Sequence, residues 1–389
     1  MKKSIFEKHE YHFSNEGGDL MESIGILGVG QAGGNLAEVA SSMGFQTALI
    51  NTNKRDGIVN TKVERKYFVP GYNGAGQDRS IGLKAVNDNY REIVDFVKNS
   101  FKKIKLLLVA FSTDGGTGSG MSPLLIDLLL EHLSGVNIGA IAIVPDRNVL
   151  TGNRINATEC IEELSKINSL SSVFLVDNDQ MRKLNPQSSK HQIYLSSNQQ
   201  VMEAIKSVLQ VTKKSSFYGN FDETDLMNIL GTRGVTIISS AQITDAKTTS
   251  DVTSKIQQSW ATSVFCPVES TGVIRSGLIY EGPEKMAKLI NVPSIFERIG
   301  EPLELFEGTY FSESDPTVTT ILAGLAFPSR RMHALEESLE KNKDRLQNLV
   351  KKEHTQKYES KIAWASTLKA KPQERKPSTV TSKLDKYQK

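Results

Sequence analysis

The chain has 389 residues, of which 38% are hydrophobic and 23% charged, with 47 basic and 44 acidic side chains. This length predicts about two domains with extensions, and the near-average glycine and proline contents exclude collagen-like and wholly low-complexity proteins. Residues 351–389 contain 11 Lys/Arg and 4 Asp/Glu, which gives this segment a net charge of +7 and leaves −4 for the rest of the chain. A mildly acidic body therefore precedes a basic tail.

Several protein classes are excluded by what the sequence lacks. Two cysteines, Cys160 and Cys266, cannot form a disulfide framework or a multi-thiolate metal site. The six histidines show no spacing typical of a metal centre, so we assign no direct protein ligand to a metal. No apolar run is long enough to span a membrane, and the N-terminus lacks the apolar stretch of a secretory signal. We therefore predict a cytoplasmic protein with no membrane partner.

The first half of the chain alternates strand-like and helix-like segments. Residues 1–20 are polar and form a predicted extension, and the pattern leaves open whether Met21 is an alternative start. The segments that follow are predicted as strands at 24–29, 47–51, 104–111, 138–144 and 172–176, and as helices at 33–42, 81–100, 122–133 and 156–167. This alternation is typical of an α/β fold with a mostly parallel sheet and helices on both faces.

The second half differs in character. It is predicted to contain helices at 199–213, 224–230, 252–262 and 283–289, strands at 234–243, 263–270, 272–282 and 317–327, and a long charged helix at 331–359. The resulting domain prediction is an extension at 1–20, a nucleotide-binding domain at 21–198, a central helix and loop at 199–233, a smaller α/β domain at 234–330, a long helix at 331–364 and a basic, disordered tail at 365–389.

The first glycine-rich loop, Gly28-Val-Gly-Gln-Ala-Gly-Gly-Asn35, lies between a predicted strand and a predicted helix. Free backbone N–H groups at a helix start bind phosphate, and glycines let the backbone approach closely. Residues 28–33 also satisfy GxGxxG, but a dinucleotide site requires an acidic residue about 20 positions later. The end of the second strand holds Asn51-Thr-Asn53, with no carboxylate before Asp56. A tight turn and a nicotinamide site remain alternatives at this point.

Two further loops strengthen the phosphate interpretation. Thr113-Asp-Gly-Gly-Thr-Gly-Ser-Gly120 offers amide and hydroxyl donors at a helix start, and it lacks the lysine of a Walker loop. Two such loops after neighbouring strands predict a ligand with several phosphates. A third segment, residues 71–77, is glycine-rich and could close over a terminal phosphate, with a flexible surface turn as the alternative.

The motifs GQAGGN and GGTGSG, followed by Asn220-Phe-Asp-Glu-Thr-Asp225, resemble those of the tubulin/FtsZ superfamily of self-assembling GTPases. The three motifs occur in the family's order, and the resemblance covers roughly residues 24–327. It implies two α/β domains joined by a central helix, with GTP or GDP and Mg²⁺ as ligands. The phosphate-binding residues implied are Gly30, Gln31, Ala32, Asn35, Gly74, Ala75, Gly76, Gly115, Gly116, Thr117, Gly118 and Ser119.

The resemblance also implies contacts to the guanine base and the ribose. Asn178 matches an asparagine that binds guanine, Gln200 stands where an aspartate often reads the base, and Arg154 resembles a nucleotide-contacting arginine. Two positions depart from the family. Thr151 stands near the place of the ribose-contacting glutamate, and Asp114 replaces a glycine of the signature loop, so the role of Asp114 is left open.

Asn220, Asp222 and Asp225 are the implied catalytic residues. In the family, these positions enter the nucleotide site of the next subunit in a filament, where the carboxylates orient the attacking water. Hydrolysis would then depend on head-to-tail polymerisation. Residues of these types near a helix start also satisfy capping preferences, which is the structural alternative.

Within the superfamily, the long charged helix and basic tail look most like the plasmid- and phage-encoded TubZ proteins. These imply DNA segregation, with a DNA-binding adaptor of the TubR kind recruited through the tail by salt-dependent contacts. The alternatives are a filament for cell division or phage positioning, a tail that only keeps filaments apart, and, from another class, an NAD-dependent oxidoreductase.

Overall fold

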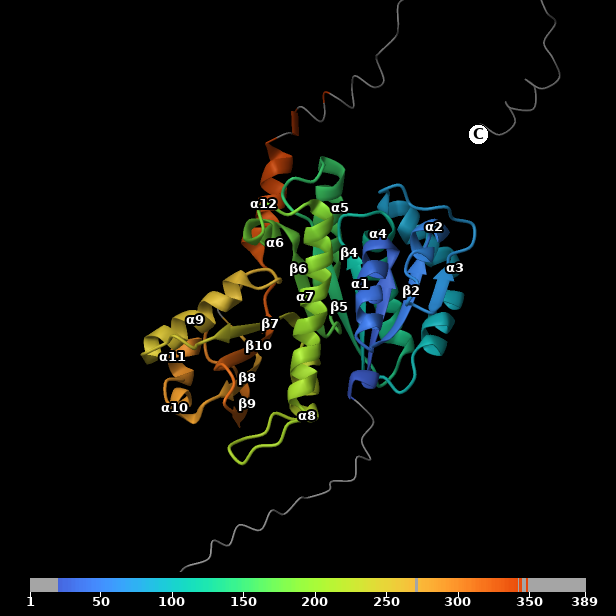
Figure 1. Cartoon of the computed structure of the whole chain (residues 1–389). Coiled ribbons are helices and arrows are strands. Elements are labelled where there is room, and N and C mark those ends of the chain that lie inside the picture. The colour runs from blue at the N-terminus through green and yellow to red at the C-terminus, as the bar shows by residue number, and fades with distance from the viewer. Residues whose placement is uncertain (1–19, 270–271, 342, 345–347, 349–389) are drawn as a thin grey trace, which may run out of the picture. The chain divides into compact units, whose positions relative to one another are not determined.

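The computed structural model describes residues 20–269, 272–341, 343–344 and 348. A ten-stranded sheet in the order β3-β2-β1-β4-β5-β6-β7-β10-β8-β9 organises residues 20–340 (Figure 1). The strands are β1 (Ile24–Val29), β2 (Gln46–Asn51), β3 (Arg65–Phe68), β4 (Leu106–Ser112), β5 (Asn137–Val144), β6 (Ser172–Asp177), β7 (Gly234–Gln242), β8 (Arg275–Gly282), β9 (Glu304–Phe311) and β10 (Thr317–Leu325). The sheet is mixed, because β10 runs antiparallel to its two neighbours and the other pairs are parallel. The predicted α/β class is confirmed.

The helices connect the strands and cover both faces of the sheet. They are the 3-10 helix η1 (Leu20–Ser23) and the α-helices α1 (Gly30–Ser42), α2 (Lys54–Ile58), α3 (Arg79–Ser100), α4 (Thr117–His132), α5 (Thr151–Lys166), α6 (Asn178–Leu184), α7 (Lys190–Val211), α8 (Glu223–Leu230), α9 (Thr249–Thr262), α10 (Glu284–Ala287), α11 (Val292–Phe296) and α12 (Ser329–Glu340). Right-handed crossovers place α1 on one face and α3, α4 and α5 on the other. Helix α7 packs beside α1, in front of the strands in Figure 1.

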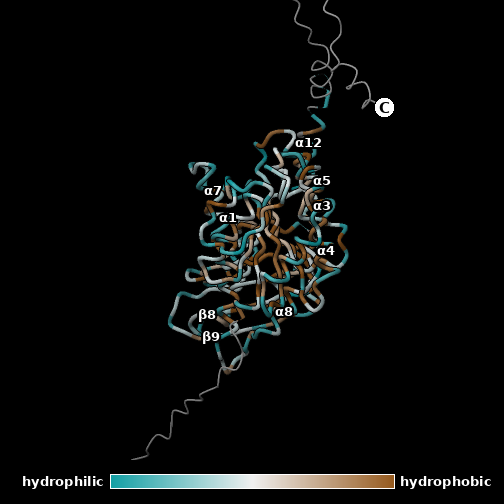
Figure 2. The backbone as a smooth tube through the Cα atoms, turned by 90° about the vertical axis from the view of Figure 1, so that its right-hand side faces the viewer, coloured by the Kyte–Doolittle hydropathy of each residue, from teal (hydrophilic) through white to brown (hydrophobic). Residues whose placement is uncertain are grey.

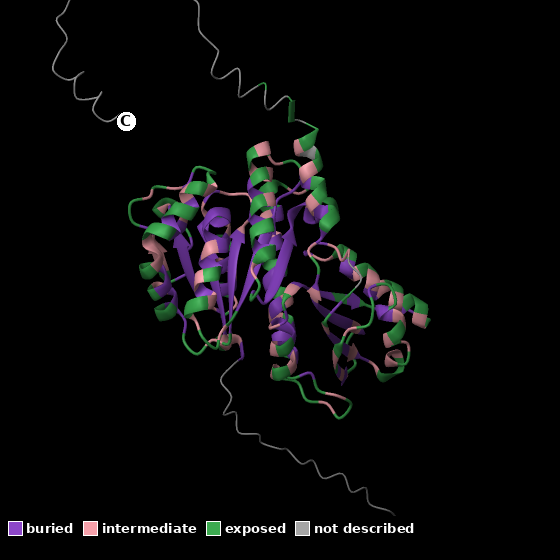
Figure 3. Ribbon diagram, turned by 180° about the vertical axis from the view of Figure 1, so that it is seen from behind, coloured by how far each residue is buried: buried purple, intermediate pink, exposed green. Residues whose placement is uncertain are grey.

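Strands β1 to β7 are mutually parallel, and their central members are buried from end to end. All six residues of β1 and of β6 are buried, as are six of the seven in β4. Such continuous apolar runs are typical of parallel strands that are covered on both faces. Figure 3 shows this buried interior between exposed helix surfaces, and Figure 2 shows hydrophobic segments of the backbone gathered in the interior.

The sheet continues into the C-terminal half with a change of direction. β10 pairs antiparallel with both β7 and β8, and β9 pairs parallel with β8. Helix α9 packs on β7, and the buried Trp260 of α9 donates a 2.8 Å hydrogen bond to Thr320 of β10. This bond satisfies the indole N–H inside the apolar layer.

Some predicted elements differ in the structure. The strand expected at 263–270 is reduced to an isolated antiparallel bridge between Phe265 and Val176. β7 pairs with only the first two residues of β6, and residues 264–266 form hydrogen bonds with the rest of the same edge. The central helix begins at Lys190 rather than 199. Of the helix predicted at 331–359, α12 accounts for the part up to Glu340. The predicted extension at 1–20, apart from Leu20, and the predicted tail at 365–389 lie outside the described residues.

Within the described residues, none of the helices combines the length and the apolar character needed to cross a membrane.

Candidate functional site

A cavity of about 550 Å³ lies at the carboxyl ends of the parallel strands. Its wall includes Val29 of β1, Asn51 of β2, Ser112 of β4 and Ile143 of β5. The strand order reverses between β1 and β4, so α1 and α4 leave the sheet on opposite faces there and open a crevice. This is the position at which open parallel sheets bind their ligands.

The first two glycine loops meet at the floor of the cavity. Gly30 has a φ of +70°, a left-handed conformation that turns the chain from β1 into α1. A Cβ on Gly33 would lie 2.0 Å from the carbonyl oxygen of Ala110, so only glycine lets α1 pack this closely on β4. The sequence motif is therefore explained first by chain packing. The close packing in turn brings the starts of α1 and α4 together.

Donors for an anion converge on this end of the cavity. Neither α1 nor α4 has a side-chain cap at its N-terminus, so first-turn N–H groups remain available to a ligand. Asn51 is 1% exposed and lines the cavity, and its Nδ2 has no hydrogen-bond partner among the described residues. A buried donor without a partner is costly. A bound phosphate oxygen would satisfy it.

The third loop borders the same end of the cavity. Asn73, Gly74, Ala75, Gly76 and Gln77 all line the wall. The loop is fixed by backbone bonds, since Gly74 N–H donates to the Thr52 carbonyl at 3.0 Å. Thr52 is in turn bonded through its hydroxyl to that of Thr117 at 2.7 Å. The three loops thus form one connected surface at the expected phosphate end.

The other end of the cavity is lined by amides and one aromatic ring. Asn178 follows β6 directly, and Tyr194 and Asn198 stand one helical turn apart on α7. The hydroxyl of Ser197 donates to Asn178 Oδ1 at 3.2 Å, which fixes this amide against α7. Amide groups can pair with the edge of a base, and an aromatic ring can stack on its face. This end suits a nucleobase.

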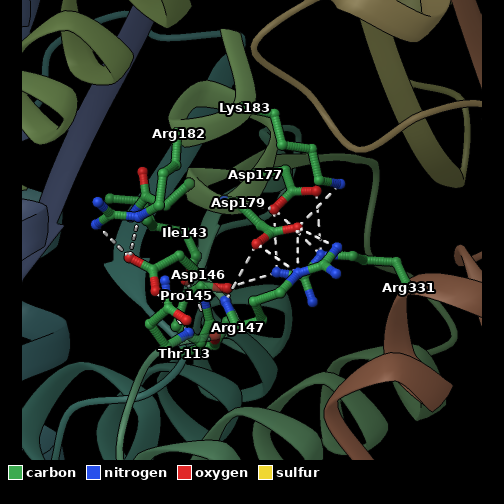
Figure 4. A network of polar contacts seen from close by, with 12 residues as sticks. Thr113, Ile143, Pro145, Asp146, Arg147, Asp177, Asp179, Arg182, Lys183 and Arg331 are labelled. Atoms are coloured by element: carbon green, nitrogen blue, oxygen red, sulfur yellow. Dashed lines mark hydrogen bonds and ion pairs between the residues drawn. The ribbon is translucent and has the colours of Figure 1, made fainter. Parts of the chain in front are cut away.

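Two ion pairs flank Asn178 in the sequence (Figure 4). Arg331 of α12 contacts Asp177, and Arg147 makes a bidentate contact to Asp179 at 2.8–3.1 Å. Burial of the Asp179 carboxyl opposes its ionisation, but hydrogen bonds from Arg147 and Lys183 outweigh burial and hold its pKa below the ordinary value. The chain on both sides of Asn178 is therefore held in place by ion pairs, which fixes the backbone at the amide end of the cavity.

The predicted catalytic carboxylates lie at the far end of α7. This helix has 22 residues and is therefore about 33 Å long. It begins beside the cavity and ends before α8, which Asp222 caps by accepting from Thr224 and Asp225 N–H. Asp225 completes the capping box with a 3.1 Å bond from Asp222 N–H. Asn220 accepts a 2.6 Å bond from Ser216 N–H. None of the three lines the cavity of their own chain.

Comparison with known families identifies this architecture. Residues 23–186 match the Tubulin/FtsZ family, GTPase domain. The chain therefore carries a Tubulin/FtsZ-family GTPase domain.

Relatives of this Tubulin/FtsZ domain span most or part of the chain. The tubulin-like protein CetZ of Pyrococcus horikoshii is 23% identical over 77% of this chain and 85% of its own length. The tubulin-like protein TubZ of Clostridium botulinum C phage is 22% identical over 40% of this chain and 45% of its own length. A GTPγS-form protofilament of Bacillus thuringiensis serovar israelensis TubZ has the same fold, with a TM-score of 0.72 and 17% identity over 84% of this chain and 94% of that one. The recognised superfamily and the predicted fold are thus confirmed.

Most residues predicted from the Tubulin/FtsZ motifs meet in the cavity wall. Gly30 and Ser119 lie just behind it. Gly30 packs on the backbone of Gly118, and Ser119 donates its hydroxyl to the Gly115 carbonyl. Those that line the wall are Gln31, Ala32, Asn35, Gly74, Ala75, Gly76, Gly115, Gly116, Thr117, Gly118 and Asn178.

Two predicted contacts of the Tubulin/FtsZ domain are not in the wall. Gln200 is exposed and donates to the Ser196 hydroxyl, because two residues beyond Asn198 a helical side chain points away from the cavity. Arg154 donates to the Arg147 carbonyl at 2.6 Å, and its neighbour Asn153 lines the wall instead.

Sequence reasoning missed Tyr194 and Asn198 because it started the central helix too late. A signal was present: Ser189 and Gln192 form the S-x-x-Q capping box that marks a helix start. The cavity wall also contains three residues at the end of β2 and the start of α2, namely Asn51, Asn53 and Asp56. From the sequence, this segment was used only to argue against a dinucleotide site, and no role in binding was predicted for it.

Proposed function

We propose that this chain binds GTP in the cavity, polymerises head to tail and hydrolyses GTP at the junction between subunits. One observation carries the proposal: the cavity lies near the start of α7, a helix about 33 Å long, and the carboxylates Asp222 and Asp225 lie beyond its far end and not in the cavity wall. A subunit cannot bring its own carboxylates to its own ligand. A second copy stacked end to end can.

The chemistry follows from where charge develops. Backbone N–H groups at the starts of α1 and α4, Thr117 and Asn51 would hold the phosphates, while Tyr194 and Asn198 would hold the base. Asp222 and Asp225 of the next copy would orient the attacking water in line with the terminal phosphate. Mg²⁺ fits this site, since it takes one or two carboxylates together with phosphate oxygens and water, and Asp56 lines the wall. When bound, it neutralises phosphate charge.

The test uses Asp222→Asn and Asp225→Asn, because asparagine keeps the acceptor that caps α8. Both variants should bind GTP and assemble, and their turnover should fall by about 100-fold, as for loss of a key electrostatic group. Phosphate release and light scattering measure the two properties. Normal turnover in both variants would refute the role of the carboxylates.

A mixing experiment tests the shared site directly. Gly115→Asp places a carboxylate in open space at the cavity wall, where it would repel phosphate. This variant and Asp222→Asn should each turn over GTP slowly alone, but a mixture should regain turnover, because intact carboxylates of one meet the intact cavity of the other. No recovery in a mixture that still assembles would contradict a site formed between subunits.

We propose further that the filament moves plasmid or phage DNA in the cytoplasm, through a DNA-binding adaptor that contacts the basic tail. The charge division between a body of −4 and a tail of +7 supports this role. Deletion of residues 365–389 should spare GTP-dependent assembly and abolish co-sedimentation of adaptor and DNA, and added salt should weaken recruitment to the full-length chain. Unchanged recruitment would favour a division or positioning filament.

A further inference from the structure

The cavity contains one carboxylate for which the proposed chemistry has no use. Asp114 begins the second glycine loop and lines the wall between Ser112 and Gly115. Ser112 donates its hydroxyl to Oδ1, and Asn153 Nδ2 lies 3.4 Å from Oδ2. Asn153 also donates to the Asp114 carbonyl at 2.9 Å, so the loop is fastened to the start of α5. The carboxylate is thus held in position by its neighbours.

Its surroundings exclude a phosphate as the partner. Two negative charges at close range in a partly dehydrated site repel each other, so Asp114 cannot face the anion held by the N–H groups of Gly116 to Gly118. Its charge does reach toward the base end. The pKa of Tyr194 is raised chiefly by burial and, among smaller contributions, by the charge of Asp114.

Asp114 thus belongs to the second glycine loop, at the phosphate end, and its charge also acts on Lys190 and Tyr194 at the start of α7, at the amide end. In a nucleotide, the sugar lies between the phosphates and the base, and its 2′ and 3′ hydroxyls are hydrogen-bond donors. An ionised carboxyl has about four acceptor positions, and Ser112, Asn153 and the backbone N–H of Asp114 itself do not use all of them. In dinucleotide sites, an acidic side chain holds the ribose hydroxyl in the same manner.

We propose that Asp114 binds the ribose hydroxyls of the nucleotide and makes the site selective for ribonucleotides over deoxyribonucleotides. This assignment rests on the proposed nucleotide site and names the group within it that recognises the sugar. The same residue has its pKa raised by burial, against which the Ser112 and Asn153 contacts act. Hydrogen bonds from a ligand would stabilise the ionised form of such a buried carboxyl.

The experiment measures GDP, 2′-deoxyGDP and 2′,3′-dideoxyGDP binding by titration calorimetry in EDTA, where neither hydrolysis nor a metal contributes. The wild-type chain should bind GDP at least about 10-fold more tightly than the dideoxy analogue, as expected for hydrogen bonds to a charged group. In Asp114→Gly this ratio should collapse toward one, and Asp114→Asn should lie between. Asp127→Asn, at an exposed carboxylate on α4, the helix that follows the Asp114 loop, should keep the wild-type ratio.

Each result decides one question. A wild-type chain that binds GDP without distinguishing the analogues overturns the ribose assignment and leaves the proposed function standing. A chain that binds neither GDP nor GTP removes the proposed function itself. Retained selectivity in a folded Asp114→Gly, with an altered Mg²⁺ requirement for GTP binding, assigns the carboxylate to the metal and also overturns the inference. Because the first comparison uses only the unaltered chain, it holds even where a variant fails to fold.

Discussion

Arg331 and Asp177 form a buried ion pair across 154 residues of sequence. Nε of Arg331 lies 3.1 Å from both carboxylate oxygens of Asp177, and Nη2 lies 3.0 Å from Oδ1. The two side chains are 8% and 2% exposed. Asp177 immediately precedes Asn178, so this pair connects α12 to the amide end of the cavity (Figure 4). It gives the C-terminal helix a direct structural link to the site.

Arg331→Met should destabilise the fold by about 3–5 kcal/mol, because it leaves the Asp177 carboxylate buried without its partner. Urea unfolding measures the loss. The double variant Asp177→Asn/Arg331→Met should recover much of it, since no unpaired charge remains. Arg330→Met is the matched control, because this neighbouring side chain is exposed. Equal losses for the two arginines would contradict the importance of the pair.

Asp179 should make the fold sensitive to acid. Its pKa is lower in the folded state than in the unfolded chain, so its contribution is fully present above the ordinary carboxyl range and declines as pH falls toward the folded value. Asp179→Asn should therefore lower the melting temperature at pH 7 and lower it progressively less below about pH 4. Thermal melts across this range measure the difference. A gap between wild type and variant that does not narrow in acid would exclude this linkage.

Two glycines at the cavity should behave differently when changed to alanine. A Cβ on Gly33 meets the Ala110 carbonyl at 2.0 Å, whereas a Cβ on Gly115 meets nothing within 4 Å. Gly33→Ala should therefore lower the free energy of unfolding by about 3 kcal/mol or more, because the added methyl group overpacks the contact between α1 and β4. Gly115→Ala should fold normally and bind GDP more weakly, since its methyl group points into ligand space. Melting and calorimetry together separate the two effects.

The sequence predicted the interior of the sheet better than its edges. β1 and β4 are continuous apolar runs, and their positions were predicted to within two residues. β3 and β9 were missed, and these are the two edge strands of the sheet. Edge strands are short or carry charged side chains because one side faces solvent, and both contain charged residues within a mixed pattern. A strand paired on one side alone lacks the continuous apolar run by which the interior strands were predicted.

The site divides in the same way. The phosphate end consists of local glycine loops, so short motifs predicted it. The amide end depends on the rotational position of α7, and the family spacing that pointed to Gln200 does not fix which residues of α7 line the cavity, which are Tyr194 and Asn198. Arg331 reaches the framework of the site from 154 residues away, and no local pattern marks such a contact.

The loop before α8 predicts a further determinant of assembly. Phe217 is fully exposed, and Tyr218 is 65% exposed while its ring packs 4.5 Å from that of Phe311. This loop adjoins Asp222, so in a head-to-tail filament the Phe217 ring would be covered by the next copy. Phe217→Ser should raise the critical concentration for GTP-dependent assembly about 10-fold or more, the effect of losing a buried aromatic anchor.

The monomer of Phe217→Ser should keep its melting temperature, because this ring makes no contribution to the folded interior. Leu303→Ser is the control, since Leu303 is 83% exposed but lies at the other end of β9 from the loop. Pelleting at a series of concentrations gives both critical values. Equal values for the two variants would remove Phe217 from the interface.

The separation of the cavity from Asp222 and Asp225 also has a consequence for the two tips of the proposed filament. The terminal copy at one tip would present a cavity that no carboxylates cover, and the copy at the other would present carboxylates with no nucleotide beneath them. Nucleotide at the first tip would therefore be open to exchange and protected from hydrolysis, whereas every internal nucleotide would be enclosed and consumed. A chain of identical subunits would thereby acquire two chemically unlike ends without any additional protein.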